Sequence, residues 1–278
     1  MENFKSNISL VNCVPGNCTR IMDTDSYFEL NCTNFDDKLM KDVRNQLEKD
    51  GYVKVKCEQI PNNDCDKAAL DIIKRIGGVC CPYSDEENSF IWPVKVLEMD
   101  APESELQASQ LDRELVFHTD CSYEQDAPKF VALYIVQYDR SEDGGKFQMV
   151  KTTDILNKLS DKSKHLLRFE TYQINVPPDF RKGDTDYICG SIILGDDLLR
   201  YRWDIIDQNR LINETAEKQD AIKELNSIIL AEDKLNVFRP LLNNNMMVLF
   251  DNTKFVHGRT KIKDSERYLL RIRFNLVY

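Results

Sequence analysis

Two of the three histidines in this chain, His118 and His257, lie in stretches whose other residues are typical of a metal site. His118 and Asp120 are separated by one position within the stretch 117–120. Side chains alternate between the two faces of an extended strand, so this imidazole and this carboxylate point the same way. His257 follows the apolar run 246–250, which is typical of a buried strand. Together, these three side chains could bind one metal ion.

Two histidines and one carboxylate on one face of a metal ion leave three coordination positions open, as in non-haem Fe(II) oxygenases. Iron held in this way can bind a bidentate co-substrate and dioxygen together. A single His-x-Asp pair is common by chance and usually marks a solvated turn or a helix cap, so the pair alone favours that interpretation. Gly258 and Arg259, which follow His257, and an arginine-bearing final strand shift the balance towards a metal site.

The final predicted strand, 267–274, alternates strictly between two faces. Its apolar face carries Tyr268, Leu270, Ile272 and Phe274, and the other face carries Arg267, Leu269, Arg271 and Arg273. A half-exposed edge strand would place its arginines in water, which is our expectation for Arg273. If this face looks into a barrel, Arg267 and Arg271 need a buried anion, because an unpaired buried charge is costly. A dicarboxylate co-substrate would supply that anion.

Length and composition predict one globular domain that acts on small molecules. A chain of 278 residues can bury one large core, and we expect residues 1–278 to form a single domain. The content of 42% hydrophobic and 30% charged residues is that of an ordinary soluble protein. The net charge of -10 argues against a nucleic-acid partner, which would require a basic patch. Free small molecules are therefore the expected substrates.

The sequence also predicts a cytoplasmic protein without a membrane partner. It contains no apolar stretch long enough to cross a bilayer, and the first residues lack the apolar core of a secretion signal. The nine cysteines are an odd number, and we expect free thiols in a reducing compartment. Cys13, Cys18 and Cys32 could in principle bind zinc, but no fourth ligand follows at a convincing spacing.

Hydrophobic periodicity predicts a mainly β protein with flanking helices. Helical spacing predicts helices over 36–50, 64–76 and 214–231, and residues 1 to about 33 should form an irregular arm. Strands are expected over 52–56, 91–97, 115–119, 130–138, 147–150, 169–176, 187–194 and 199–205. Many short strands at this spacing favour a sandwich or a jelly roll.

The order of the motifs resembles the Fe(II)/2-oxoglutarate dioxygenases of the taurine dioxygenase and clavaminate synthase type. Between residues 116 and 274 the chain carries His-x-Asp, a Gly-Gly turn, Asp-Asn before a distal His-Gly-Arg, and Arg-x-x-x-Arg. The resemblance implies a double-stranded β-helix, or jelly roll, in which Fe(II) is bound by His118, Asp120 and His257. It also implies that Arg267 binds the distal carboxylate of 2-oxoglutarate, with Arg271 close to this co-substrate.

One position departs from the family pattern. Family members usually carry a threonine shortly after the Gly-Gly turn, and it shares the distal carboxylate of 2-oxoglutarate. Here Gly144 and Gly145 are followed by Lys146 and Phe147. Phe147 cannot donate a hydrogen bond, so either Arg267 alone holds the carboxylate or another donor replaces the threonine.

The resemblance implies that O2 and 2-oxoglutarate are consumed, giving succinate and CO2, while an unactivated C–H bond is hydroxylated or desaturated. Several enzymes of the clavaminate synthase type act on amino acids, free or built into natural products, so the implied substrate is an amino acid or an amino-acid-derived intermediate. Two other functions remain: a catalytically silent jelly-roll binding protein, and a zinc hydrolase with the same triad. The intact triad argues against the first, and the second leaves Arg267 and Arg271 unexplained.

The stretch 200–207 is the best sequence candidate for substrate contacts, because it mixes both charges with aromatic residues at the end of a predicted strand. The acidic balance of the chain favours a cationic substrate. We expect an amine or guanidinium group to meet Asp204, with Asp207 as second choice. In the alternative interpretation Asp204 caps a turn beside a packed Trp203, and the recognition site lies elsewhere, for example in the loop 99–113.

Overall fold

The computed structural model describes residues 26–83, 90–97, 107–195, 198–206, 211 and 214–277. Within these residues, seven strands form one large sheet in the order β1-β2-β12-β6-β14-β3, with β4 also paired to β14. Their bounds are β1 Phe28–Asn31, β2 Tyr52–Glu58, β3 Gly78–Cys80, β4 Ile91–Lys95, β6 Phe130–Gln137, β12 Met246–Asp251 and β14 Tyr268–Leu276. The final strand is therefore central, because β6 pairs with one side of it and β3 and β4 pair with the other.

A second sheet carries the two predicted histidine ligands, His118 and His257. Its strands are β5 (Leu115–His118), β13 (Phe255–Arg259) and β7 (Phe147–Lys151), in the order β5-β13-β7. Two short antiparallel ladders accompany it, β8 (Tyr172–Asn175) with β9 (Tyr187–Gly190) and β10 (Ile193–Leu194) with β11 (Leu198–Leu199).

The two sheets face each other across a shared apolar core. The large sheet contributes residues such as Leu133, Val248 and Leu269, and the second sheet contributes Phe147 and Met149. Alternation along β14 directs Leu270, Ile272 and Phe274 to the opposite side of the large sheet, as the sequence predicts. This arrangement confirms the predicted mainly β fold of the jelly-roll type.

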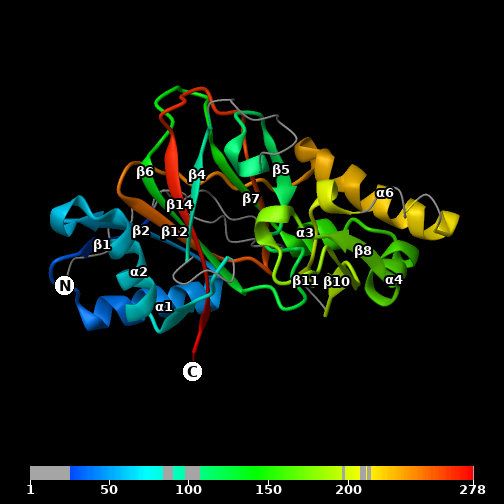
Figure 1. The fold of residues 1–278 in the computed structure, drawn as a ribbon, viewed down its shortest axis with the longest axis horizontal. Helices are drawn as coiled ribbons and strands as arrows, with labels where there is room; N and C mark the ends of the chain where they lie inside the picture. The colour runs from blue at the N-terminus through cyan, green and yellow to red at the C-terminus, as the bar shows by residue number, and fades with distance from the viewer. Residues whose placement is uncertain are drawn as a thin grey trace, which may run out of the picture.

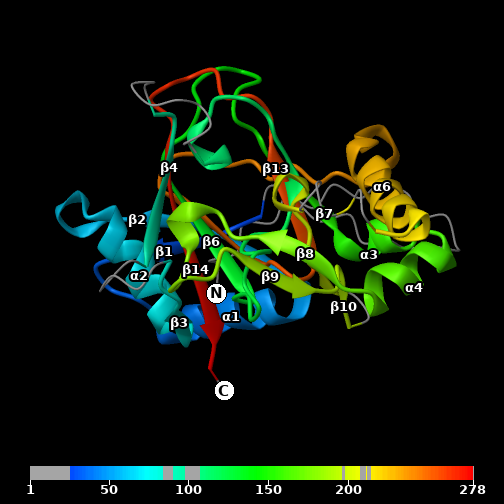
Figure 2. The same ribbon diagram turned by 45° about the vertical axis from the view of Figure 1, so that its right-hand side comes forward.

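Helices cover the outer faces of the two sheets (Figures 1 and 2). Helices α1 (Asp37–Asp50) and α2 (Cys65–Arg75) pack on the large sheet, where Val43, Leu47 and Ile72 are fully buried. Helices α3 (Thr152–Leu156), α4 (Asp161–Phe169) and α6 (Ala216–Leu230) share a core with Val150 and Val256 of the second sheet. Short 3-10 turns complete the described elements: η1 Pro61–Asn63, η3 Ala108–Gln110, η4 Pro178–Phe180, η5 Trp203–Ile205 and η6 Glu232–Lys234.

The ends of α1 follow from local chemistry. Asp36 caps the helix, because its carboxylate accepts hydrogen bonds from the backbone N–H groups of Lys38 and Leu39. Gly51 ends it in the left-handed conformation, with φ of 73° and its N–H donated to the carbonyl of Leu47. No helix in the described part of the chain is long and apolar enough to span a membrane.

Several expected elements differ from the structure. The strand expected over 187–194 is divided into β9 and β10. Residues 28–31, expected in an irregular arm, form β1, whose parallel pairing with β2 the local sequence does not reveal. The strand expected from residue 169 begins at Tyr172, because α4 continues to Phe169. The strand expected over 199–205 is confined to 198–199. Beyond it, the backbone N–H of Tyr201 donates to the Thr119 hydroxyl, so a side chain takes the place of a strand partner.

Candidate metal centre and co-substrate site

The structure brings His118, Asp120 and His257 together. His118 ends β5, and His257 lies directly opposite it on β13. The Asp120 carboxylate oxygens lie 3.8 Å from Nε2 of His118 and 3.7 Å from Nε2 of His257. All three residues are buried, and one ligand atom of each lies within 4.8 Å of the others. This cluster could hold a metal ion.

Gly258 permits the close approach of the two strands that carry the histidines. A Cβ at this position would lie 2.5 Å from the carbonyl oxygen of Leu115 and 3.2 Å from the backbone nitrogen of Phe117. The pairing of β5 with β13 shifts register between His257 and Arg259, as at a β-bulge. The glycine of the His-Gly-Arg motif therefore sets the spacing of the metal site.

Asn252 positions Asp120, which lies just beyond the end of β5. The Asn252 side chain accepts a 2.8 Å hydrogen bond from the backbone N–H of Asp120 and donates another of 2.8 Å to the Asp120 carbonyl. Cys121, the next residue, has a positive φ of 57°. The two bonds of the Asn252 amide hold the chain in place at this sharp change of direction. Sequence reasoning recognised Asn252 only as part of a motif.

The hydrogen bonds and charges around the three side chains suit a divalent metal. Nδ1 of His118 lies 2.8 Å from the Val116 carbonyl and donates to it, which leaves Nε2 free to bind a metal. Burial, assisted by His118, lowers the pKa of His257 to about 3, so this ring is neutral. Burial alone would raise the pKa of Asp120, but Arg271 and the two histidines hold it well below its usual range. The neutral imidazole of His257 and the ionised carboxylate of Asp120 therefore meet beside Nε2 of His118.

Unsatisfied polar atoms at the cluster also fit a bound cation. Oδ2 of Asp120 is buried and accepts no hydrogen bond from any described residue. An isolated buried carboxylate oxygen is costly, and a metal ion would satisfy it. Such a donor set of imidazole and carboxylate suits iron and similar divalent metals.

Arg271 lies beside the cluster, and its guanidinium donates hydrogen bonds to two side chains there. Its Nη1 donates a 2.7 Å hydrogen bond to Oδ1 of Asp120, and its Nε donates to the hydroxyl of Tyr83 at 3.2 Å. Its guanidinium lies within 6.0 Å of the ring centres of Tyr83, Trp92 and Phe180. The structure thus places Arg271 against a candidate metal ligand within an aromatic wall.

Arg267 contributes a buried positive charge to the site. The residue is 3% exposed, and its Nε and Nη1 find no hydrogen-bond partner among the described residues. Burial lowers its pKa to about 10, so the side chain remains a cation near neutral pH. Because unpaired buried charge is costly, this guanidinium requires an anion, as the sequence analysis expects.

The glycine turn makes room for Arg267. Gly145 has a φ of 53°, and a Cβ there would lie 2.7 Å from Nε of Arg267. Phe147, which stands near the position of the family threonine, packs its ring 5.7 Å from that of Phe250 and 5.8 Å from that of His257. This residue offers an apolar wall and no hydrogen-bond donor.

Arg259, the arginine of the His-Gly-Arg motif, is buried, and the sequence did not reveal its contacts. Its guanidinium donates to the carbonyls of Ala108, Leu111 and Arg113, and its buried Nε has no partner among the described residues. Burial, together with the charge of Arg267, lowers its pKa to about 9. Arg259 therefore ties β13 to the segment before β5 and adds positive charge near Arg267.

The expectation for Arg273 is wrong. This residue is fully buried, and it contacts Glu124, the Cys81 and Pro82 carbonyls and the Cys121 sulfur. The expectation failed because β14 lies inside the large sheet, whereas the alternation of side chains is equally compatible with an edge strand.

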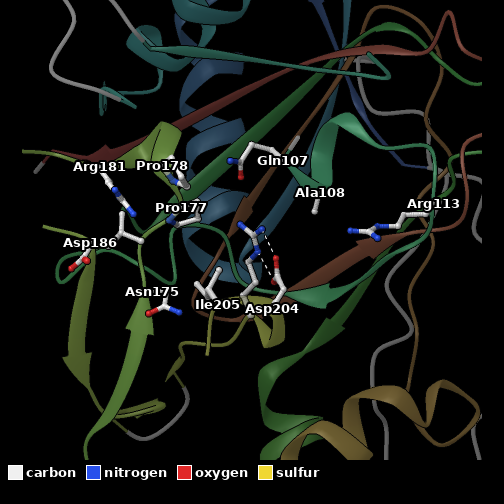
Figure 3. A pocket seen from close by; sticks show the side chains of 12 residues that line it. Gln107, Ala108, Arg113, Asn175, Pro177, Pro178, Arg181, Asp186, Asp204 and Ile205 are labelled. Atoms are coloured by element: carbon white, nitrogen blue, oxygen red, sulfur yellow. Dashed lines mark hydrogen bonds and ion pairs between the residues drawn. The ribbon is translucent and has the colours of Figure 1, made fainter. Parts of the chain in front are cut away.

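Asp204 lines a cavity of about 490 Å³ (Figure 3). The Asp204 carboxylate forms a bidentate ion pair with Arg202, at 2.8 Å from Nε and 2.6 Å from Nη2. A substrate cation would therefore compete with Arg202 for this carboxylate, and the contact expected from the sequence stays a prediction. Asp207, the second predicted substrate residue, lies outside the described residues.

Several solved structures have a fold similar to that of this chain. Asparagine oxygenase in complex with Fe(II), 2S,3S-3-hydroxyasparagine and succinate aligns with a TM-score of 0.67 and 20% identity, covering 87% of this chain and 80% of that chain. OrfP, a non-heme iron oxygenase, in complex with Fe and alpha-ketoglutaric acid aligns with a TM-score of 0.63 and 13% identity, covering 87% and 81%. OrfP with Fe, succinate and (3S)-hydroxy-L-Arg gives a TM-score of 0.65 at 11% identity, covering 87% and 82%.

These solved structures share the fold of this protein at low identity. No curated protein matches the sequence. Residues 23–273, by contrast, match the family described as taurine catabolism dioxygenase TauD, TfdA family. Since this match spans most of the sequence, the chain belongs to the TauD/TfdA family of dioxygenases.

Proposed function

We propose that this protein is an Fe(II)- and 2-oxoglutarate-dependent dioxygenase that hydroxylates an unactivated C–H bond of an amino acid or an amino-acid-derived natural-product intermediate. The buried cluster of His118, Asp120 and His257 carries the proposal. Family membership supports it. The similar structures of asparagine oxygenase and OrfP contain hydroxylated amino acids together with succinate and iron, which supports an amino acid as substrate class.

In this proposal each side chain of the site has a distinct task. His118 and His257 would bind Fe(II) through ring nitrogens, and Asp120 through its carboxylate. The bound iron would supply the activation of O2 that accompanies conversion of 2-oxoglutarate to succinate and CO2. Arg267 would hold the distal carboxylate of 2-oxoglutarate, because its buried guanidinium has unpartnered N–H groups. Phe147 would exclude water beside His257.

Arg271 would fix the orientation of Asp120 and lie close to the co-substrate. Its hydrogen bond engages one oxygen of Asp120 and leaves the other for the metal. The substrate would enter the cavity that Arg202 and Asp204 line. Asp207 stays the second substrate contact predicted from the sequence. Desaturation in place of hydroxylation would use the same residues.

Two further inferences concern the whole chain. We infer one catalytic domain across residues 1–278, because β12 contributes to the core on both faces of the large sheet, through Met247 on one face and Val248 on the other. We infer a cytoplasmic location, because all seven cysteines in the described part of the chain are free thiols. Cell fractionation tests the location.

Anaerobic addition of Fe(II) and 2-oxoglutarate tests the function. A bidentate complex of 2-oxoglutarate with iron has a weak visible absorption band, and we expect this band to form. Admission of O2 with a substrate should then release succinate. A zinc hydrolase would form no such band, and a catalytically silent binding protein would release no succinate, so either failure identifies the competing function.

A further inference from the structure

Tyr138 and Arg267 are neighbours at one end of the large sheet. Strands β6 and β14 are antiparallel, and their last pair at this end joins Gln137 to Tyr268. Tyr138 follows Gln137 and Arg267 precedes Tyr268, so the two residues leave the ladder at the same end, one on each strand. Residues in this cross-strand relationship are close enough for their side chains to meet.

Both side chains face the core between the two sheets. Alternation along β14 puts Arg267 on the same face as Leu269, which is buried in that core. Tyr138 packs against the same core. A Cβ at Gly145 would lie 2.7 Å from Nε of Arg267 and 3.2 Å from Cβ of Asp139, the residue after Tyr138. The glycine turn, Tyr138 and Arg267 therefore lie around one site.

Tyr138 has a hydroxyl that can donate to a ligand in this site. Its backbone is held in place, because its N–H donates to Oδ1 of Asn244 at 2.7 Å and its carbonyl accepts a 2.8 Å bond from the side chain of Gln137. Its hydroxyl makes no hydrogen bond with any residue that the structure describes. Burial raises the pKa of Tyr138 against the opposing effect of Arg267 and Lys146, so the hydroxyl keeps its proton near neutral pH.

Other donors near the glycine turn already have partners. Nζ of Lys146 pairs with Oδ1 of Asp143 at 2.9 Å. The Thr260 hydroxyl accepts the backbone N–H of Lys146 at 2.9 Å and donates to the Asp143 carbonyl at 3.3 Å. Arg259 directs both terminal nitrogens to backbone carbonyls of the segment before β5. Among these side chains, Tyr138 is the one whose terminal donor has no partner.

We propose that the Tyr138 hydroxyl donates a hydrogen bond to the distal carboxylate of 2-oxoglutarate, which Arg267 binds through its charge. This inference rests on the proposed function and adds a co-substrate contact that replaces the threonine of the family pattern. A carboxylate accepts hydrogen bonds at both of its oxygens, so two donors can hold it together. Strand β7 carries Phe147 near the position of that threonine, and the longer Tyr138 side chain would reach the same carboxylate from the end of β6.

Binding titrations of the anaerobic Fe(II) protein, measured by the visible band and by calorimetry, test the proposal without turnover. Tyr138→Phe removes the hydroxyl alone, and it should weaken 2-oxoglutarate binding about tenfold. Its affinity for 2-oxovalerate, which has the same carbon chain without the distal carboxylate, should equal that of wild type. The matched control is Tyr268→Phe, because Tyr268 is adjacent to Arg267 but packs on the opposite face of the sheet. It should change neither affinity.

The outcomes separate this inference from the proposed function. Equal 2-oxoglutarate affinity in wild type and Tyr138→Phe would overturn the inference. An equal loss of affinity for both keto acids would also overturn it, because Tyr138 would then act through packing. If no visible band forms even in wild type, the proposed function fails, and calorimetric titration of metal-free protein with glutarate, a dicarboxylate without the keto group, decides the inference alone. Tighter binding by wild type than by Tyr138→Phe would support it, whereas equal binding or none would overturn it.

Discussion

Arg271 and Asp120 form a buried ion pair, in which Nη1 of the guanidinium lies 2.7 Å from Oδ1 of the carboxylate. The pair joins the central strand β14 of the large sheet to the end of β5 in the second sheet. It leaves Oδ2 of Asp120 without a hydrogen bond from any described residue, beside Nε2 of His257 at 3.7 Å. The oxygen held by Arg271 thus lies 3.8 Å from Nε2 of His118, and the other oxygen faces His257.

The first prediction concerns the ligands themselves. His257→Ala should abolish iron binding and 2-oxoglutarate turnover, because it removes one of three protein donors. The same result is expected for His118→Ala and Asp120→Ala. Metal content after dialysis measures the loss, and circular dichroism should show a retained fold. His165→Ala is the control, since this histidine is exposed on α4. Substantial 2-oxoglutarate decarboxylation by His257→Ala would exclude it as a ligand.

Arg267→Gln should weaken 2-oxoglutarate binding. A charge-assisted hydrogen bond to a carboxylate contributes about 1.5–3 kcal/mol, which corresponds to roughly ten- to a hundredfold in affinity. Phe147 offers no alternative donor. Titration of the visible band with 2-oxoglutarate gives the dissociation constant of wild type and variant. Unchanged affinity would mean that the buried guanidinium of Arg267 serves another anion.

Arg273→Ala should instead impair folding. The substitution leaves Glu124 and the backbone carbonyls without the hydrogen bonds that Arg273 donates to them. Breaking a buried ion pair typically costs about 3–5 kcal/mol. We expect a large drop in the denaturation midpoint, with 2-oxoglutarate affinity preserved in the fraction that remains folded. A stable variant with weakened 2-oxoglutarate binding would place Arg273 in the co-substrate site.

The contrast between these arginines shows what the sequence can and cannot predict. The triad was predictable because the His-x-Asp pair occurs together with His257-Gly258-Arg259 and the arginines of the final strand, and the alternation of β14 correctly separated its two faces. The neighbours of β14 were not predictable, because they come from β3, β4 and β6, so the burial of Arg273 was missed. The contact of Asn252 with Asp120 and the pairing of Arg202 with Asp204 depend in the same way on tertiary geometry.

Acid should destabilise the metal-free protein through His257. Burial lowers the pKa of this histidine from 6.5 to about 3, so the unfolded chain takes up a proton before the folded protein does. The free energy of unfolding should therefore fall as the pH falls below about 6.5, by at most about 1.4 kcal/mol per pH unit from this group.

Urea denaturation between about pH 5 and pH 7 measures this slope. The Asp120 carboxyl contributes only at lower pH, because its pKa lies well below the usual range. His257→Gln should reduce the slope, and His165→Gln should leave it unchanged. Equal slopes in wild type and His257→Gln would show that His257 is not held neutral by the fold.

The last prediction tests how the glycine turn serves Arg267. Gly145→Ala should weaken 2-oxoglutarate binding about tenfold or more, because the new Cβ would lie 2.7 Å from Nε and 2.8 Å from Cδ of Arg267 and displace the guanidinium. The positive φ of 53° adds backbone strain of roughly 1–2 kcal/mol. Gly183→Ala is the matched control, since its φ is 61° but its Cβ would have no neighbour within 4 Å. Both variants should lose some stability, whereas only Gly145→Ala should require more 2-oxoglutarate to form the visible band. If both variants retain wild-type affinity for 2-oxoglutarate, Arg267 does not depend on the space that Gly145 leaves.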